Sequence, residues 1–207
     1  VFSSESCGLD IIGAELVRDV EPGEIIIIKN NKLESIKPFS KSYLRPCLFE
    51  YIYFARPDSI LDGRNVYQVR KKIGHELATE NFDDREKIDV VIPIPDSGNA
   101  SALGYAEKIG RNFDLGIIRN HYTGRTFIQE SNTIRNLSVK LKHNPNLTSL
   151  KNKNIALIDD SIVRGTTSIK IVEMLKNCGV KKIHMRIASP PVMFPCFYGI
   201  DTPNKDE

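Results

Sequence analysis

The sequence has little that would tie the protein to a membrane or to nucleic acid. Its 29 basic and 26 acidic residues leave a formal net charge of only +3, which is too even to indicate a nucleic-acid or anionic-membrane surface. No apolar run approaches the roughly 20 residues that a membrane-spanning helix needs. The first residues also lack the pattern of a secretory signal peptide. We therefore expect a water-soluble chain in the cytoplasm.

Metal-binding patterns are also scarce. The four cysteines and four histidines are dispersed, without the short spacings of a zinc site. Such cysteines are typical of an intracellular protein whose thiols stay reduced. Cys7 is expected to be a buried structural thiol.

What the chain does have is an alternation of apolar strands and amphipathic helices. With 207 residues, 41% of them hydrophobic, it can form one sizeable α/β domain and a smaller part. The pattern predicts buried strands over residues 88–92, 115–118, 155–158 and 181–187, and helices over residues 66–80, 100–110 and 168–178. Strands that alternate with helices indicate a mostly parallel sheet flanked by helices.

The opening of the chain has a different character. Residues 24–29 and 33–36 are predicted strands, and Asn30–Asn31 suits the hairpin turn between them because Asn tolerates positive φ. A few short strands cannot form an independent core. We therefore expect residues 1–39 to be the end of a larger β-rich domain and residues 40–207 to form the main domain.

The most informative stretch is residues 155–167. A buried strand runs into two adjacent carboxylates, Asp159 and Asp160, then into a loop with Gly165 and two threonines. Carboxylates accept hydrogen bonds from vicinal sugar hydroxyls and suit a hard divalent cation. The N-terminus of the next helix offers free N–H groups to a phosphate. This combination suits a ribose 5-phosphate, and the alternative is that the acids only cap the helix.

Two further segments carry weaker signals. Residues 93–99 form a strand–turn–helix junction that suits a phosphate, or else an ordinary turn. The long stretch over residues 119–154 contains several basic side chains and few periodic signals. It is either a lid that covers an anionic ligand or a solvated basic loop.

Residues 159–167, Asp-Asp-Ser-Ile-Val-Arg-Gly-Thr-Thr, resemble the phosphoribosyl pyrophosphate (PRPP) loop of type I phosphoribosyltransferases. Within this class, the residue string resembles that of the amidophosphoribosyltransferases, the glutamine-dependent enzymes of the first step of purine synthesis. Residues 50–59 resemble that family's Glu-Tyr-Ile-Tyr-Phe-Ala-Arg-Pro-Asp-Ser signature at its domain junction. Residues 4–15 resemble the segment that closes its glutaminase domain.

The resemblance implies a type I phosphoribosyltransferase fold, preceded by a few strands left from an N-terminal-nucleophile glutaminase domain. It implies formation of 5-phosphoribosylamine from PRPP and ammonia, with glutamine as the ammonia source in the intact enzyme. The glutaminase nucleophile, an N-terminal cysteine, is absent from this chain. The alternatives are a non-catalytic PRPP-sensing regulator and a salvage base phosphoribosyltransferase.

Family motifs assign roles residue by residue. PRPP binding falls to Asp159, Asp160, Ser161, Arg164, Gly165, Thr166 and Thr167. The magnesium ion would be held by Ser97, Asp159 and Asp160. The catalytic lid residues would be Arg119, Tyr122 and Arg125, although His121 and Thr123 depart from the family's lid motif.

Some members of the family also carry a structural iron–sulfur cluster with four cysteine ligands. Cys47 and Cys196 match two of these positions, so the resemblance implies a cluster in the full-length parent and not in this chain. It further implies purine nucleotide inhibitors and a homo-oligomeric parent. Neither nucleic acid nor a membrane is an expected partner.

Overall fold

The computed structural model describes residues 1–121, 143–163, 165–196 and 198. The chain divides into two compact units, Val1–Val66 and Tyr67–Glu207. In the described residues, no helix combines the length and the apolar character that a membrane crossing requires.

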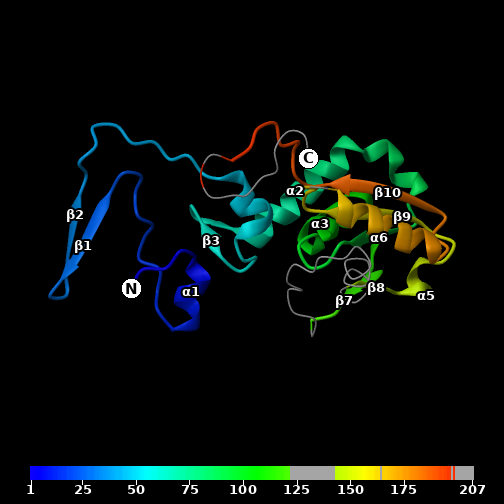
Figure 1. Cartoon of the computed structure of the whole chain (residues 1–207), viewed down its shortest axis with the longest axis horizontal. Coiled ribbons are helices and arrows are strands. Elements are labelled where there is room, and N and C mark those ends of the chain that lie inside the picture. The colour runs from blue at the N-terminus through cyan, green and yellow to red at the C-terminus, as the bar shows by residue number, and fades with distance from the viewer. Residues whose placement is uncertain (122–142, 164, 197, 199–207) are drawn as a thin grey trace, which may run out of the picture. The chain divides into compact units, whose positions relative to one another are not determined.

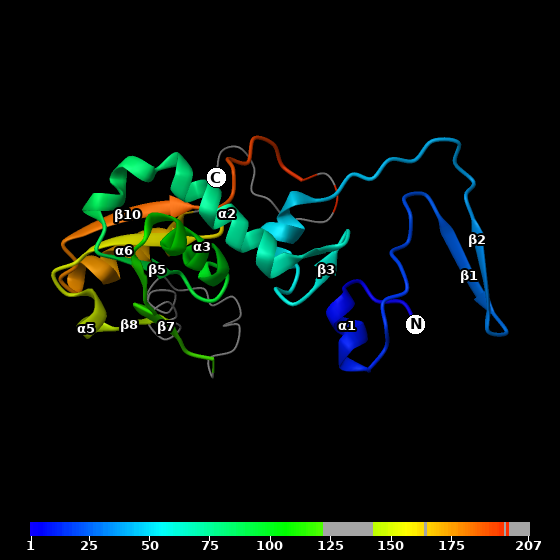
Figure 2. The same cartoon turned by 180° about the vertical axis from the view of Figure 1, so that it is seen from behind.

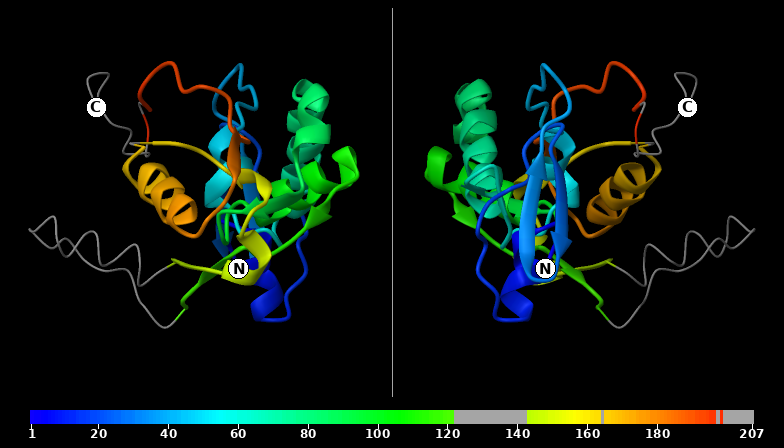
Figure 3. Two further views of the ribbon diagram at one scale, coloured as in Figure 1. Left: turned by 90° about the vertical axis from the view of Figure 1, so that its right-hand side faces the viewer. Right: turned by 90° about the vertical axis from the view of Figure 1, so that its left-hand side faces the viewer.

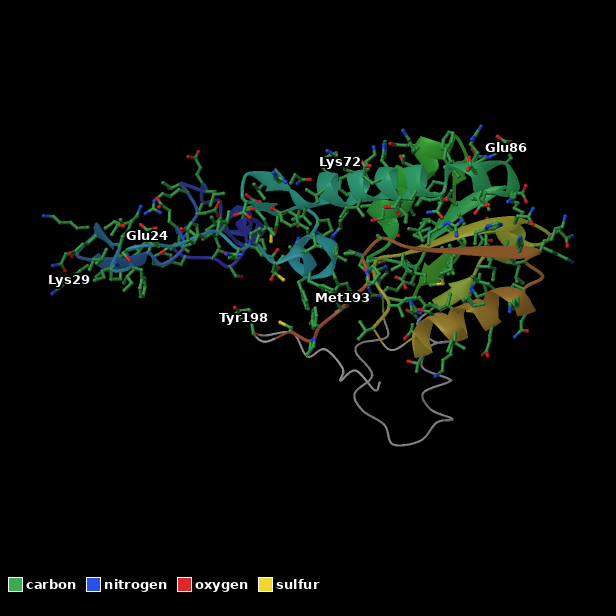
Figure 4. All side chains as sticks on the ribbon, turned by 90° about the horizontal axis from the view of Figure 1, so that it is seen from above. Glu24, Lys29, Lys72, Glu86, Met193 and Tyr198 are labelled. Carbon is green, nitrogen blue, oxygen red and sulfur yellow. The ribbon has the colours of Figure 1, made fainter. Side chains whose placement is uncertain are left out.

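The first unit is built from short elements. They are α1 (Ser6–Ile11), β1 (Ile25–Lys29), β2 (Lys32–Ile36), the π-helical turn η1 (Glu50–Phe54), β3 (Ile60–Leu61) and β4 (Arg64–Asn65). The predicted hairpin is confirmed: β1 and β2 pair antiparallel, and Asn30 and Asn31 have φ values of 49° and 58°. Figure 4 labels Glu24, which directly precedes β1, and Lys29, the last residue of β1. Every residue of β2 is exposed, so the hairpin contributes no core of its own.

A partly exposed carboxylate, that of Glu5, joins two segments of this unit that are far apart in sequence. Glu5 Oε2 accepts hydrogen bonds from the Arg56 backbone N at 2.8 Å and from Ser59 Oγ at 2.7 Å. The Ser6 hydroxyl accepts another from the Ile60 backbone N at 2.7 Å. Cys7 beside them is 6% exposed, so the expectation of a buried thiol is confirmed.

The second unit contains a four-stranded parallel sheet in the order β10-β9-β5-β6. Figures 1 and 2 show this sheet and its helices from opposite sides. The elements are α2 (Val66–Glu80), η2 (Phe82–Lys87), β5 (Val90–Pro93), α3 (Asn99–Ile109), β6 (Asn112–Phe113), β7 (Ile117–Arg119), β8 (His143–Pro145), α5 (Leu147–Leu150), β9 (Asn154–Asp159), α6 (Thr166–Asn177) and β10 (Lys182–Ile187). The helix predicted over residues 66–80 is confirmed, and α6 begins two residues before its predicted start.

Alternating side chains of β5 and β9 fill two separate cores. Val91, Ala156 and Ile158 pack with α2 and α3, whereas Ile92 and Leu157 pack with α6 on the other face. Figure 3 shows the yellow-orange helix α6 on one side of the sheet and the green helices α2 and α3 on the other. The chain therefore leaves β5 and β9 towards opposite faces and opposite edges. In such sheets the ligand crevice lies at the carboxyl ends of those two strands.

Helices α2 and α3 approach each other through glycines. A Cβ atom on Gly74 would lie 2.0 Å from the Ser101 carbonyl oxygen, and one on Gly104 would lie 2.0 Å from the Lys71 carbonyl oxygen. The Ser101 hydroxyl donates to the Arg70 carbonyl oxygen at 3.1 Å, and Lys71 pairs with Glu107 at 2.7 Å. This close crossing holds α3 against the sheet and so sets the place of the loop that precedes it.

Candidate functional site

The two adjacent acids lie at the carboxyl end of β9, where the fold predicts a ligand crevice. Asp159 is 9% exposed and Asp160 is 5% exposed. Asp159 Oδ1 accepts a hydrogen bond from the Asp160 backbone N at 2.9 Å, and Asp160 Oδ1 accepts one from the Ser161 hydroxyl at 2.5 Å. Burial, followed by the nearby charge of Asp160, raises the pKa of Asp159 to about 7. The two acids are therefore held in a poorly solvated place, where a negative charge on Asp159 beside Asp160 is unfavourable.

The backbone beneath these acids is held from both sides. On one side, Ala188 N donates to the Asp159 carbonyl oxygen at 2.9 Å and Ser189 N donates to the Asp160 carbonyl oxygen at 2.8 Å. On the other side, Ile94 N donates to the Ile158 carbonyl oxygen at 2.8 Å. Hydrogen bonds on both sides fix the direction in which the two carboxylates leave the strand.

A second loop, residues 94–98, follows β5 and lies directly against β9. At Gly98 an added Cβ would be 2.6 Å from the Ile158 carbonyl oxygen and 2.8 Å from the Ile94 carbonyl oxygen, so only glycine fits there. This contact places Ser97, which is partly exposed, on the loop beside the end of β9 that carries the two acids. The role of Gly98 was not predicted, although a glycine just after a buried strand is a sequence signal for a close backbone contact.

The loop after Asp160 ends in a glycine that starts α6. Gly165 is the N-cap, with φ 73° and ψ −16°, and no side chain caps the helix. The alternative in which the two acids cap this helix is therefore wrong. Thr166 and Thr167 are exposed in the first turn, which contains no acidic residue. The N–H groups and the positive end of α6 are thus available to an anion.

Of the predicted lid residues, the structure describes only Arg119, the last residue of β7. Its Nη1 atom lies 2.6 Å from Asp96 Oδ2, in the loop after β5. Arg119 also lies opposite His143 where β7 pairs antiparallel with β8. Tyr122 and Arg125 fall outside the described residues, as does Arg164 of the PRPP loop. The lid and its roles stay predictions.

The site suits a hard cation better than a soft one. Asp159, Asp160 and Ser97 offer carboxylate and hydroxyl oxygens, the ligands that Mg²⁺ prefers. Neither acid forms an ion pair with a basic side chain of the described residues, so a cation would offset their charge. In the part of the chain that the structure describes, no three His, Cys, Asp or Glu side chains gather into a complete metal site. Oxygens of a bound phosphate and of water would have to complete the magnesium shell.

The two cysteines matched to the iron–sulfur cluster lie in different units. Cys47 is exposed and Cys196 is half-buried, with its Sγ atom accepting from the Tyr198 backbone N at 3.4 Å. The described cysteines are not gathered into a four-thiolate site. The cluster stays a prediction for a longer parent.

Comparison with known proteins places this geometry in a family. Residues 58–188 match the family model of the phosphoribosyl transferase domain. The chain belongs to this family. The expected type I phosphoribosyltransferase fold, a parallel sheet flanked by helices, is confirmed.

Relatives of this phosphoribosyl transferase domain extend over the whole chain. The chain is 52% identical to the amidophosphoribosyltransferase of Rhizobium etli and 49% identical to the chloroplastic amidophosphoribosyltransferase of Vigna aconitifolia. Each alignment covers 100% of this chain and 42% of the relative. It is also similar to the solved structure of the glutamine PRPP amidotransferase from B. subtilis complexed with ADP and GMP. That match has a TM-score of 0.88 and 45% identity, over 98% of this chain and 44% of the other. The chain thus spans about two fifths of the length of the curated relatives named here.

Gly165→Ala tests whether the start of α6 binds an anion, because the change should leave the domain folded. Among the described residues, chain neighbours aside, only Ile162 Cγ2 comes within 4.0 Å of an added Cβ, so the folding cost is the left-handed backbone strain of about 1 kcal/mol. Binding of pyrophosphate or ribose 5-phosphate, measured by calorimetry, should weaken about tenfold or more because the backbone could no longer approach the anion closely.

Gly110→Ala is the matched control for this variant. Gly110 is the C-cap of α3, with φ 66°, and apart from its chain neighbours no described residue comes within 4 Å of an added Cβ. It should lose similar stability and keep full anion affinity. Equal losses of affinity in both variants would contradict the assignment of Gly165 to the anion site.

Proposed function

We propose that this chain is the phosphoribosyltransferase part of an amidophosphoribosyltransferase. It would bind PRPP with magnesium and transfer the phosphoribosyl group to ammonia, giving 5-phosphoribosylamine. The observation that carries the proposal is the pair of buried acids at the carboxyl end of β9, followed by the glycine-capped N-terminus of α6. The roughly 50% identity to amidophosphoribosyltransferases supports the choice of acceptor.

The geometry suggests a division of labour within the site. Asp159 and Asp160 would accept hydrogen bonds from the ribose hydroxyls, while Ser161 and the segment Gly165–Thr167 would hold the 5-phosphate. The loop over residues 94–98 would hold the pyrophosphate group, together with Arg119. Arg164 would add charge on the 5-phosphate side.

The chemical step is a displacement at C1 of the ribose. The nitrogen lone pair of ammonia forms the C–N bond, the C–O bond to pyrophosphate breaks, and the new ammonium group then loses a proton to water. A magnesium ion held by Ser97, Asp159 and Asp160 would neutralise charge on the departing pyrophosphate. The chain's own residues contribute positioning and electrostatic stabilisation, and no covalent nucleophile is required.

The parent protein would extend this activity. Glutamine would supply ammonia through a further domain, and the product would feed purine synthesis. The B. subtilis neighbour was solved with ADP and GMP, which supports purine nucleotides as inhibitors of the parent. We further propose a homo-oligomer, an iron–sulfur cluster that includes Cys47 and Cys196, and a cytoplasmic location. The chloroplastic relative makes a plastid the alternative location.

The test is magnesium-dependent release of pyrophosphate from PRPP by the 207-residue chain, first with ammonium and then with glutamine. We expect turnover with ammonium, no stimulation by glutamine, and loss of turnover in the Asp159→Asn/Asp160→Asn double variant. Tight PRPP binding without turnover would instead favour a sensor. Turnover with a purine or pyrimidine base would favour a salvage enzyme.

A further inference from the structure

The loop that would hold pyrophosphate already contains an anion of its own. Asp96 lies in the turn between β5 and α3, next to Ser97, and its Oδ2 atom is 2.6 Å from Arg119 Nη1. Arg119 belongs to a different strand, β7, of which it is the last residue. Its side chain reaches the turn that contains Asp96. The contact therefore joins two segments that the proposed function assigns to the same phosphate groups.

The surroundings of Asp96 favour an anion. It lies three residues before α3, whose first turn has no acidic residue and whose N-cap, Gly98, offers no side-chain cap. The Asn99 backbone N donates to the Asp96 carbonyl oxygen at 3.2 Å, which keeps the turn tight against the helix start. A carboxylate here is attracted both by the helix N-terminus and by the guanidinium of Arg119. A pyrophosphate group would be attracted by the same two partners.

We propose that Asp96 competes internally with pyrophosphate for Arg119. In the ligand-free chain its carboxylate occupies the guanidinium, and the bound pyrophosphate takes that guanidinium over. Asp96 is thus a positioning residue that sets the affinity of the site for its anionic ligand through Arg119. This inference rests on the proposed function and adds a residue that none of the predicted roles includes.

The exposure of the two side chains makes such an exchange feasible. Arg119 is 44% exposed and Asp96 is 46% exposed, and ion pairs this exposed contribute about 0 to 1 kcal/mol. A pyrophosphate carries more charge than one carboxylate and can accept two parallel hydrogen bonds from a guanidinium. It therefore displaces Asp96, and the free energy needed to break the Asp96–Arg119 ion pair lowers the affinity for pyrophosphate.

Calorimetric titration with inorganic pyrophosphate tests the competition. Kd is measured for the unmodified chain, Asp96→Asn, Arg119→Met and the double variant, in EDTA and again with magnesium. Asp96→Asn should tighten binding by about two- to fivefold, the equivalent of breaking an exposed ion pair, and Arg119→Met should weaken it. In the Arg119→Met background, Asp96→Asn should change Kd by less than about twofold.

Two further variants test whether the change in Kd is specific to the carboxylate of Asp96. Asp83→Asn removes the same charge from an exposed position in η2, ahead of β5, and should leave Kd unchanged. Asp96→Glu retains a carboxylate and should restore Kd to within about twofold of the unmodified chain. Thermal melts of all variants should agree within a few degrees, because the pair is exposed.

The outcomes separate the two proposals. Unchanged or weaker binding in Asp96→Asn, or equal tightening with and without Arg119, would overturn the competition while leaving the proposed function in place. No binding of pyrophosphate by the unmodified chain, with or without magnesium, would overturn the proposed function and the competition together.

Discussion

Asp159→Asn should make the ligand-free protein more stable at pH 8 and remove the magnesium-dependent turnover of PRPP that we propose for this chain. The stability gain follows from burial: the Asp159 carboxyl is 9% exposed and its pKa is raised from 3.8 to about 7. An asparagine of the same shape keeps the acceptor for the Asp160 backbone N and has no charge to bury. The loss of turnover follows because the amide cannot replace an anionic oxygen towards a cation or a sugar hydroxyl.

The direction of the pH effect follows from the raised pKa. Below about pH 4 the Asp159 carboxyl is protonated in both folded and unfolded chains, so its burial does not lower the free energy of unfolding through a charge. Between about pH 4 and pH 7 the unfolded chain loses this proton while the folded chain keeps it, so stability falls as pH rises. Above about pH 7 the carboxylate is charged in both states, and its burial lowers the free energy of unfolding by on the order of 2 to 4 kcal/mol.

Denaturant unfolding of both proteins at several values between pH 4 and pH 8 measures this effect. The difference in unfolding free energy between Asp159→Asn and the unmodified chain should grow across this range by about 2 to 4 kcal/mol. Glu173→Gln, which changes an exposed carboxylate in α6, is the control and should show no such growth. A difference that does not depend on pH would contradict the buried-charge explanation.

Gly104→Ala should be among the most destabilising small changes in the second unit. The added Cβ would lie 2.0 Å from the carbonyl oxygen and 2.9 Å from the carbonyl carbon of Lys71. Both are backbone atoms of α2, so the helices must separate and the packing of Ala102 and Tyr105 beneath them must loosen. We expect a loss of about 3 kcal/mol or more, against a gain of up to about 1 kcal/mol from the better helix propensity of alanine.

Thermal unfolding measures this loss, with an expected fall of about 6 to 12 °C in Tm. Gly74→Ala should behave alike, because its Cβ would meet the Ser101 carbonyl oxygen at 2.0 Å. The Gly74→Ala/Gly104→Ala double variant should lose less stability than the two single variants lose together, because one separation of the helices relieves both clashes. Gly110→Ala, where the added Cβ meets no described residue beyond its chain neighbours, should cost only about 1 kcal/mol. An unchanged Tm in Gly104→Ala would mean that α2 and α3 do not cross this closely.

Local patterns were enough to predict most elements of the second unit. The helix over residues 66–80 has the predicted bounds, and residues 155–158 form the centre of β9. Apolar residues at helical spacing predicted the buried face of α6, where Ile171 and Leu175 are fully buried. These features depend on neighbours in the sequence, so they can be inferred from it.

Contacts between distant segments were not predictable in this way. The pairing of Asp96 with Arg119, the fit of Gly98 against Ile158 and the raised pKa of Asp159 all arise where separate strands meet. Each depends on distances and burial that no single segment specifies.

For this protein the sequence by itself determined the family, the order of the main strands and helices along the chain, and the loop that would bind PRPP; the short elements β6, β8 and α5 were not predicted. The sequence was sufficient for this because the groups proposed to bind PRPP lie largely in one continuous segment, from Asp159 to Thr167. Only the tertiary structure decided which other residues share that site. Parallel pairing of β5 with β9 and of β9 with β10 brings the loops after all three strands to one edge of the sheet. There the burial of Asp159, the fit of Gly98 and the partner of Arg119 are set by packing between strands and helices that are far apart in the sequence.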